Sequence, residues 1–264
     1  MNRIDNKFRE LKKRGRKALI AFFTAGDYGL ANTKKLVLEF ASRGVDIIEL
    51  GVPFSDPVAD GPTIQISSER ALRRGTKLKD IIAAVKDLRK RTEVPIVLMG
   101  YYNPILKYGV DRFVSDCSKN GVDGVIIPDL PPEESAELIG PSRRKGLATI
   151  FLLSPTSTVR RIKLISGRSK GFIYYVSLTG TTGARSSLPA DLSQRVRLIK
   201  RHSKLPVCVG FGVSSPGQVR QVCRAADGVI VGSAIVKEIE RNSGKKQFIR
   251  NVGEYVQKLT EAAH

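Results

Sequence analysis

The chain contains little of the raw material that several kinds of site require. It has no tryptophan, two histidines and three cysteines among 264 residues. His264 is the last residue and His202 lies in the polar stretch KRHSK, so neither a histidine-ligated metal site nor a Ser–His–Asp triad is expected. Cys117, Cys208 and Cys223 are odd in number and lack CxxC spacing, which favours structural thiols in a reducing compartment. Acid–base chemistry would therefore fall to carboxylates or tyrosines.

Long hydrophobic runs are also missing. No uninterrupted apolar stretch is long enough to span a bilayer, and no apolar signal-peptide core follows the N-terminus. Hydrophobic residues still make up 41% of the chain, enough for a sizeable core. We therefore expect a folded cytoplasmic protein without membrane attachment.

Acidic residues are scarce beside basic ones, with 25 Asp and Glu against 45 Lys and Arg, which gives a net charge of +20. The cations are spread along the chain, and the densest run, RELKKRGRK (9–17), carries no nucleic-acid-binding motif. Aromatic residues are only 6%. The composition predicts no specific nucleic-acid partner, although a basic field would attract an anionic small molecule.

Eight short apolar runs recur along the chain, and amphipathic stretches such as 31–44, 78–91 and 192–202 separate them. The runs are ALIAFF (18–23), VDIIEL (45–50), VPIVLMG (94–100), DGVIIP (123–128), ATIFLL (148–153), GFIYYV (171–176), LPVCVG (205–210) and DGVIVG (227–232). Runs that are apolar throughout indicate strands buried on both faces. Eight strand–helix units predict a single (β/α)₈ TIM barrel domain over residues 1–264, with an open doubly wound sheet as the alternative.

Helix signals fit the same plan. Ile4, Phe8 and Leu11 are spaced for one face of a short extra N-terminal helix. A further helix is expected at 65–75, and several helices end at a glycine, for example Gly44.

Unusual polar and glycine-rich segments follow the runs, at the end where such barrels carry their sites. These segments include TAGD (24–27), YYNP (101–104), DLPP (129–132), SLTGTTGAR (177–185), GFGVSS (210–215) and GSA (232–234). The glycines of the last three loops, with Ser233 at the start of a helix, indicate a phosphate cup, although each glycine alone could serve only a tight turn.

The stretch ELGVPFSDPVADGP (49–62) places acidic residues in a proline-stiffened loop. Glu49 ends the second run, and Asp60 lies in a loop that can fold back over the barrel mouth. Two carboxylates in different environments can divide into an acid and a base, although Glu49 could instead be a satisfied core carboxylate. Asp56 suits a cap or a partner contact.

These motifs together resemble those of the tryptophan synthase alpha subunit family. The segments that carry the resemblance are LGVPFSDPVADGPTIQ (50–65), AFFTAGD (21–27), GYYNP (100–104), IPDLP (127–131), SLTGTTGAR (177–185), GFGVSSPGQV (210–219) and GSAIVK (232–237). They cover nearly the whole chain in order. Two features depart from the family: Tyr28 stands where proline is commoner, and the charge of +20 is unusual.

The resemblance implies a retro-aldol lyase that splits indole-3-glycerol phosphate into indole and glyceraldehyde 3-phosphate. It implies no cofactor and no metal in this chain, with pyridoxal phosphate only in a beta subunit. The partner would be that beta subunit, in an alpha–beta–beta–alpha heterotetramer through which indole passes.

Site residues follow from the resemblance position by position. Glu49 would be the general acid–base and Asp60 the partner of the indole N–H. The substrate-binding set comprises Phe22, Tyr101, Ile126, Leu152, Tyr174, Thr182, Gly183, Phe211, Gly212, Gly232 and Ser233. The set near the beta-subunit contact comprises Asp56, Asn103, Pro104 and Asp129.

Three other functions compete with this interpretation. A stand-alone lyase that releases free indole would carry the same motifs. A different phosphate-binding barrel, such as a sugar-phosphate isomerase or aldolase, is disfavoured by the Glu49–Asp60 pair and by the lack of an evident Schiff-base lysine. A basic binding protein that has lost catalysis is disfavoured because the acid pair and the phosphate loops are intact.

Overall fold

The computed structural model describes residues 2–176, 191–210 and 212–264, and its strands form one sheet of parallel neighbours in the order β5-β4-β3-β2-β1-β9-β8-β7-β6. The strands are β1 (Ala18–Thr24), β2 (Ile47–Gly51), β3 (Ile96–Met99), β4 (Gly124–Ile126), β5 (Ala148–Ile150), β6 (Leu152–Leu153), β7 (Ile173–Val176), β8 (Val207–Gly210) and β9 (Gly228–Val231). Every predicted run contains a strand, so the barrel is confirmed and the open doubly wound sheet is wrong.

The fifth run supplies two strands because one extended segment pairs with both of its neighbours. Its first half, β5, pairs with β4, and its second half, β6, pairs with β7. Phe151, between the halves, accepts a hydrogen bond from the backbone N–H of Tyr174 at 3.2 Å. Strands of a barrel are staggered, so this segment joins the two ends of the sheet.

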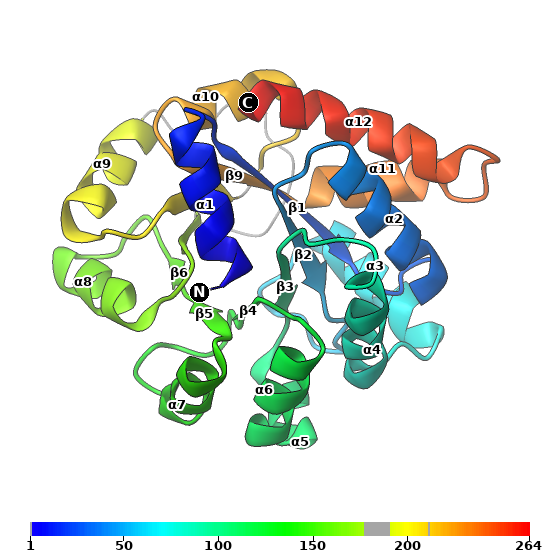
Figure 1. Ribbon diagram of the computed structural model, residues 1–264, viewed down its shortest axis with the longest axis horizontal. Helices are drawn as coiled ribbons and strands as arrows, with labels where there is room; N and C mark the ends of the chain where they lie inside the picture. The colour runs from blue at the N-terminus through cyan, green and yellow to red at the C-terminus, as the bar shows by residue number, and fades with distance from the viewer. Residues whose placement is uncertain (1, 177–190, 211) are drawn as a thin grey trace.

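Helices surround the sheet (Figure 1). They are α1 (Arg3–Lys13), α2 (Leu30–Ser42), α3 (Pro62–Arg73), α4 (Leu78–Leu88), α5 (Tyr102–Tyr108), α6 (Val110–Lys119), α7 (Ala136–Lys145), α8 (Val159–Arg168), α9 (Leu192–His202), α10 (Pro216–Cys223), α11 (Ser233–Asn242) and α12 (Phe248–Ala263). The predicted N-terminal helix is α1, and the predicted helix at 65–75 is α3, which begins three residues earlier, at Pro62. Gly44 follows α2 with a φ of 83°, a left-handed conformation that ends the helix without strain.

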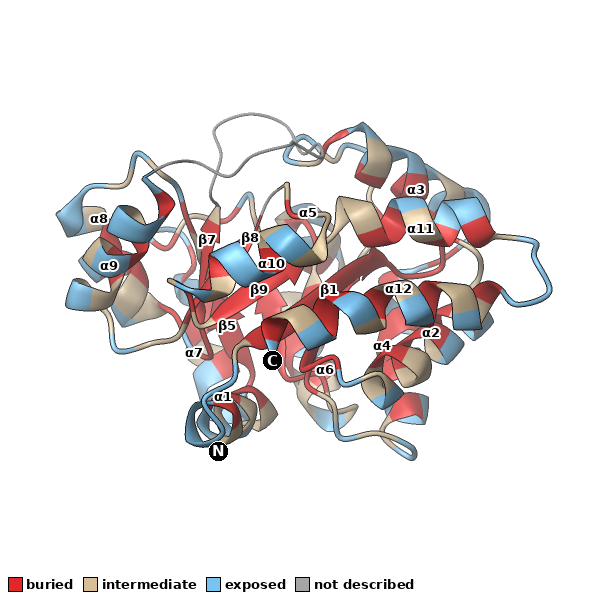
Figure 2. Ribbon diagram, turned by 90° about the horizontal axis from the view of Figure 1, so that it is seen from above, coloured by how far each residue is buried: buried red, intermediate tan, exposed pale blue. Residues whose placement is uncertain are grey.

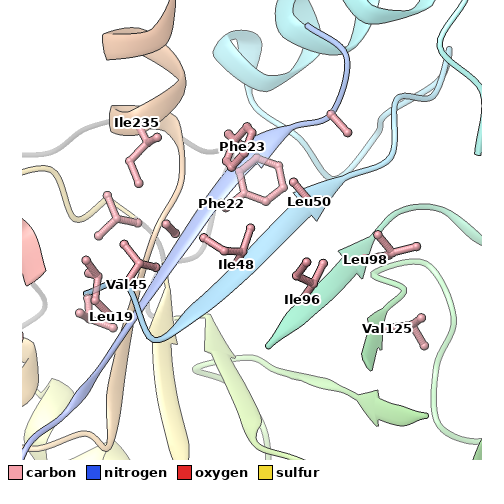
Figure 3. Packing of buried hydrophobic residues seen from close by; sticks show 14 of the residues in the cluster. Leu19, Phe22, Phe23, Val45, Ile48, Leu50, Ile96, Leu98, Val125 and Ile235 are labelled. Carbon is pink, nitrogen blue, oxygen red and sulfur yellow. The ribbon is translucent and has the colours of Figure 1, made fainter. Parts of the chain in front are cut away.

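The core has two layers, because successive strand side chains point to opposite faces. The outer layer lies between the sheet and the helices, and it includes Ile48 and Leu50 of β2 (Figure 3). The inner layer fills the barrel, and α1 closes its lower end with Ile4, Phe8 and Leu11. In Figure 2, α1 lies at one end of the barrel and α3 and α5 lie at the other, which carries the loops after the strands and is called the mouth below.

The described residues include no helix long and apolar enough to cross a membrane. That residues 1–264 form a single domain stays a prediction.

Candidate functional site

Glu49 points into the barrel because it lies two residues after the inward-facing Ile47 of β2. It pairs in register with Phe22 of β1, and its side chain is fully buried. Neither carboxylate oxygen has a hydrogen-bond partner among the described residues. Burial, and secondarily the charge of Asp60, raise the pKa of Glu49 from 4.5 to about 8. A satisfied core carboxylate would have partners, so this one is free to exchange a proton with a ligand at neutral pH.

Asp60 lies at the end of the loop that follows β2 and is held there by Tyr101. The Tyr101 hydroxyl donates to Asp60 Oδ2 at 3.0 Å and accepts from the backbone N–H of Ala59 at 2.9 Å. Phe54, in the same loop, stacks on the Tyr101 ring with 5.1 Å between centroids. Burial raises the pKa of Asp60 to about 6, although the Tyr101 hydrogen bond acts to lower it. The two carboxyl groups therefore titrate on opposite sides of neutrality.

Replacing Tyr101 with phenylalanine should weaken the anionic form of Asp60, because it removes the hydroxyl that stabilises that charge. We expect the pKa of Asp60 to rise. For the reaction that the resemblance implies, kcat/KM measured as indole release near pH 6 should fall by about tenfold, the effect of one hydrogen bond to a charged group. The matched control is Tyr108→Phe, which removes a tyrosine–aspartate hydrogen bond of 2.7 Å to Asp116, and neither of these residues lines the cavity at the mouth or contacts Asp60. Equal losses of kcat/KM in the two variants would contradict the role assigned to the hydrogen bond between Tyr101 and Asp60.

A cavity of about 250 Å³ opens at the mouth and is lined by Asp60. Glu49 is not part of the lining, although Phe22, with which it pairs in register, is. The lining includes seven of the predicted site residues: Phe22, Asp60, Leu152, Tyr174, Gly212, Gly232 and Ser233. It also includes residues that the motifs did not single out: Ala59, Ile64, Met99, Pro128, Val176, Val213, Ser214, Ile230 and Ala234. Met99, Val176 and Ile230 lie in the apolar runs, and the other six stand inside the segments that carry the resemblance, so both patterns held a signal for them.

Small residues leave room for the aromatic walls of the cavity. A Cβ atom at Gly51 would lie 2.8 Å from the Phe22 ring, and one at Gly210 would lie 2.5 Å from the Tyr174 hydroxyl oxygen. Both are closer than real Cβ contacts, so a side chain at either position would displace the ring. Gly210, which the sequence suggested for the phosphate cup, thus also makes space for Tyr174.

The far side of the cavity is suited to an anion. Gly232 is the N-cap of α11, and Ser233 and Ala234 open the helix and line the cavity. The first N–H groups of a helix have no partner within it and carry the positive end of its dipole. Gly212, also in the lining, has a φ of 75°, which favours glycine.

Other predicted residues lie beside the cavity or outside the described residues. Ile126 is fully buried in the inner core with Tyr174 and does not line the cavity. Tyr101 lines a smaller space next to it together with Phe22 and Asp60. Thr182, Gly183 and Phe211 lie outside the described residues.

The predicted partner-contact residues lie on the rim of the mouth. Asp56 and Asn103 are exposed. Asp129 is exposed and accepts from the backbone N–H of Tyr102 at 3.0 and 3.2 Å, at the start of α5, two residues before Pro104. The structure adds Val58, an apolar side chain that is 80% exposed in the loop of Asp56.

A buried ion pair braces the helix that follows the Asp60 loop. Arg70 of α3 binds Asp27 through two bonds of 2.6 and 3.0 Å and Glu240 of α11 through one of 2.7 Å. Tyr28 lies beneath Arg70 and Arg74, whose guanidinium carbons are 5.2 and 5.9 Å from its ring centroid. Tyr28, which stands where proline is commoner in the family, therefore supplies a packing surface for these two cations.

Replacing Arg70 with methionine should leave Asp27 buried without its charge partner and lower the free energy of unfolding by about 3 kcal/mol or more. Arg73→Met, on the same helix, breaks only the exposed pair with Glu69 and should cost less than about 1 kcal/mol. Chemical denaturation of both variants measures the difference, and similar values would contradict the bracing role.

Metal-ligand groups are scarce in the part of the chain that the structure describes, where no three His, Cys, Asp or Glu side chains are grouped to hold an ion. The three cysteines are free thiols, with Cys117 and Cys208 buried. Burial raises the pKa of the Cys223 thiol to about 11, which leaves it protonated at neutral pH.

Comparisons with known proteins agree with this geometry. The family model described as Tryptophan synthase alpha chain matches residues 8–264. The tryptophan synthase alpha chain of Geobacter sulfurreducens is 55% identical over 262 residues, which cover 99% of both chains. That of Geotalea daltonii is 55% identical over 246 residues, which cover 93% of both.

A solved structure gives the same result. The crystal structure of tryptophan synthase subunit alpha from Legionella pneumophila superposes with a TM-score of 0.93 at 39% identity and covers 100% of this chain and 98% of that one. The motifs, the barrel and these matches at high identity and coverage lead to one conclusion: the chain belongs to the tryptophan synthase alpha chain family.

Proposed function

We propose that this enzyme subunit cleaves indole-3-glycerol phosphate into indole and glyceraldehyde 3-phosphate by a retro-aldol reaction. The observation that carries the proposal is the buried Glu49 carboxyl, without a hydrogen-bond partner among the described residues, paired with Asp60 beside an apolar cavity. Family membership does not favour the stand-alone lyase or an unrelated phosphate-binding barrel.

Glu49 is proposed to move both protons of the reaction. With a pKa raised to about 8, its carboxyl is protonated at neutral pH and can protonate the ring carbon C3 of the indole. The resulting carboxylate then takes the proton of the hydroxyl on the adjacent side-chain carbon. The carbon–carbon bond breaks, its electron pair returns to the ring as indole leaves, and the hydroxyl carbon becomes the aldehyde. Glu49 ends protonated, as it began.

Asp60 is proposed to stabilise the charge that protonation creates. Once C3 carries the proton, the indole nitrogen becomes positive, and an anion at its N–H lowers the energy of that state. With a pKa of about 6, Asp60 is ionised at neutral pH, and Tyr101 holds its carboxylate in place. Phe22 and Leu152 offer apolar surface to the flat ring.

The phosphate is proposed to bind at Gly232 and Ser233, where the N-terminus of α11 meets the cavity, with Gly212 opposite. Thr182, Gly183 and Phe211, outside the described residues, complete the proposed substrate site. Wall positions behind the lining, such as Ile126, shape the slot from the core.

A tryptophan synthase beta subunit is the proposed partner, in an alpha–beta–beta–alpha assembly that receives the indole in the cytoplasm. Asp56, Asn103, Pro104 and Asp129 stand on the mouth rim, and the exposed Val58 gives that rim an apolar contact. The reaction proposed for this chain requires no cofactor or metal of its own, and pyridoxal phosphate would belong to the partner.

The test is to mix the purified protein with indole-3-glycerol phosphate and follow indole release, with and without a beta subunit. Slow release that rises sharply with the partner supports the proposal. Fast release without the partner would favour the stand-alone lyase, and no release under either condition would overturn the proposed reaction.

A further inference from the structure

The excess positive charge is concentrated in one third of the chain because acidic residues are missing there. Residues 138–226 contain 16 Lys and Arg but a single acidic residue, Asp191, which gives a net charge of +15 out of the total of +20. The rest of the chain contains 29 basic and 24 acidic residues. The described part of this third contains β5 to β8 and the helices α7 (from Leu138 on), α8, α9 and α10, which follow one another around one side of the barrel in Figure 1.

The ends of three of these helices form what we call the basic rim, made of Arg143, Arg144, Lys145, Lys170, Arg201 and Lys204. All six side chains are exposed, and none makes an ion pair with a carboxylate of the described residues. Arg143, Lys145 and Lys170 border a hollow of about 990 Å³ beside the start of α1, and its lining also contains Asp5, Glu93 and Asp123. Glu93 and Asp123 are paired there with Arg3. The segment after α9, which contains Lys204, leads into β8, and β8 pairs with β7, the strand that follows Lys170.

The basic rim lies at the closed end of the barrel, opposite the mouth. Helix α1 covers that end, and the helices that follow the strands finish there (Figure 2). A ligand on the rim would therefore leave the cavity and the proposed beta-subunit contact uncovered.

Helix dipoles account for only part of this charge. Cations at helix C-termini are stabilising, but the same effect favours acids at N-termini. Helix α7 follows this pattern, with Glu137 in its first turn, whereas the first turns of α8 and α9 contain no acidic residue. Lys170 and Lys204 lie beyond the ends of α8 and α9, so the charge of the basic rim is not confined to the last turns of its helices.

The chemistry of the rim suits a phosphate backbone better than a protein surface. Protein interfaces depend on buried aromatic or aliphatic anchors. Among the described residues the exposed large apolar side chains are Val58, Ile66, Leu72, Leu106 and Val159, and none lies on the rim; Val159 is at the opposite end of α8. Nucleic acid can be held by phosphate contacts alone. The guanidinium group of arginine, with its forked N–H donors, matches the geometry of a phosphate.

We propose that the basic rim binds double-helical nucleic acid through its phosphates, without reading sequence, while the mouth stays free for catalysis. The rim carries no exposed aromatic residue on which unpaired bases would stack, so a duplex is the favoured form. Such binding is compatible with the expected absence of specific recognition, because phosphate contacts carry no sequence information.

The experiment measures binding of a labelled mixed-sequence duplex of roughly 20 base pairs, two helical turns, between about 50 and 200 mM salt. The test variant combines Lys145→Glu, Lys170→Glu and Lys204→Glu. The control combines Lys35→Glu, Lys79→Glu and Lys86→Glu, three exposed lysines on α2 and α4 that make no ion pair with a described residue. Both variants change the net charge equally, and both should keep wild-type indole release.

We expect the rim variant to bind the duplex more weakly than the control. The slope of log affinity against log salt concentration should be shallower for the rim variant than for the control by about 2.7, the effect of three lost phosphate contacts. Equal losses in the two variants would show that diffuse net charge is responsible and overturn the proposal. Poly-glutamate competing as well as the duplex would also overturn it, in favour of an acidic protein surface.

Discussion

Replacing Glu49 with glutamine should lower kcat for indole release by about 10³-fold or more, because the amide can neither give nor take a proton. The change is nearly isosteric in a fully buried position. Steady-state kinetics at neutral pH measures the loss, and substrate binding should persist because the apolar walls and the phosphate end are untouched. Activity within tenfold of the wild type would contradict the role proposed for Glu49.

Stability provides the internal control for that variant. The folded-state pKa of Glu49, about 8, lies above its ordinary value of 4.5, so the neutral form contributes stability below about pH 4.5 that is lost as pH rises through about 8. Glutamine cannot ionise, so the variant should gain on the wild type by about 1.4 kcal/mol for each step of one in pH within that window. A variant that is destabilised at every pH would show that its inactivity reflects the fold.

Replacing Asp60 with asparagine should lower kcat/KM by about 10² to 10³-fold, the usual effect of removing one preorganised electrostatic contact to a developing charge. The pKa of Glu49 should also fall, because the like charge of Asp60 contributes to raising it. Steady-state kinetics measures the loss in kcat/KM, and the pH dependence of kcat/KM measures the shift in the pKa of Glu49. Asp111→Asn, on the exposed start of α6, is the matched control and should change neither quantity.

An unchanged rate in Asp60→Asn would place the indole nitrogen elsewhere in the cavity. A lower rate with an unchanged pH profile would mean that the two carboxyl groups act independently, against the coupling that their shared burial implies.

The barrel could be predicted from sequence because its strands are buried on both faces and are therefore apolar throughout. The split of the fifth run at Phe151 could not, since it depends on which neighbour each half pairs with across the closed sheet. Helix α3 also begins three residues earlier than expected, because Pro62 is accepted in the first turn.

The candidate site was predictable in its identities and less so in its contacts. Glu49 and Asp60 stood out as acids next to a strand end, but their different pKa values depend on burial and on each other. Tyr101 was expected to bind the substrate, whereas its hydroxyl contacts Asp60, a partner 41 residues away in sequence. The bracing of α3 by Arg70 joins residues from three separate segments, which no local pattern reveals.

The proposed mechanism depends most on a Glu49 carboxyl that is protonated at neutral pH beside an ionised Asp60. The most direct test is the pH dependence of kcat/KM for indole release, which reports the essential groups of the free enzyme. The mechanism predicts an alkaline limb with an apparent pKa of about 8, shifted to lower pH in Asp60→Asn. A profile that stays level or rises through pH 9 in the wild type would contradict the proposal that Glu49 delivers the first proton.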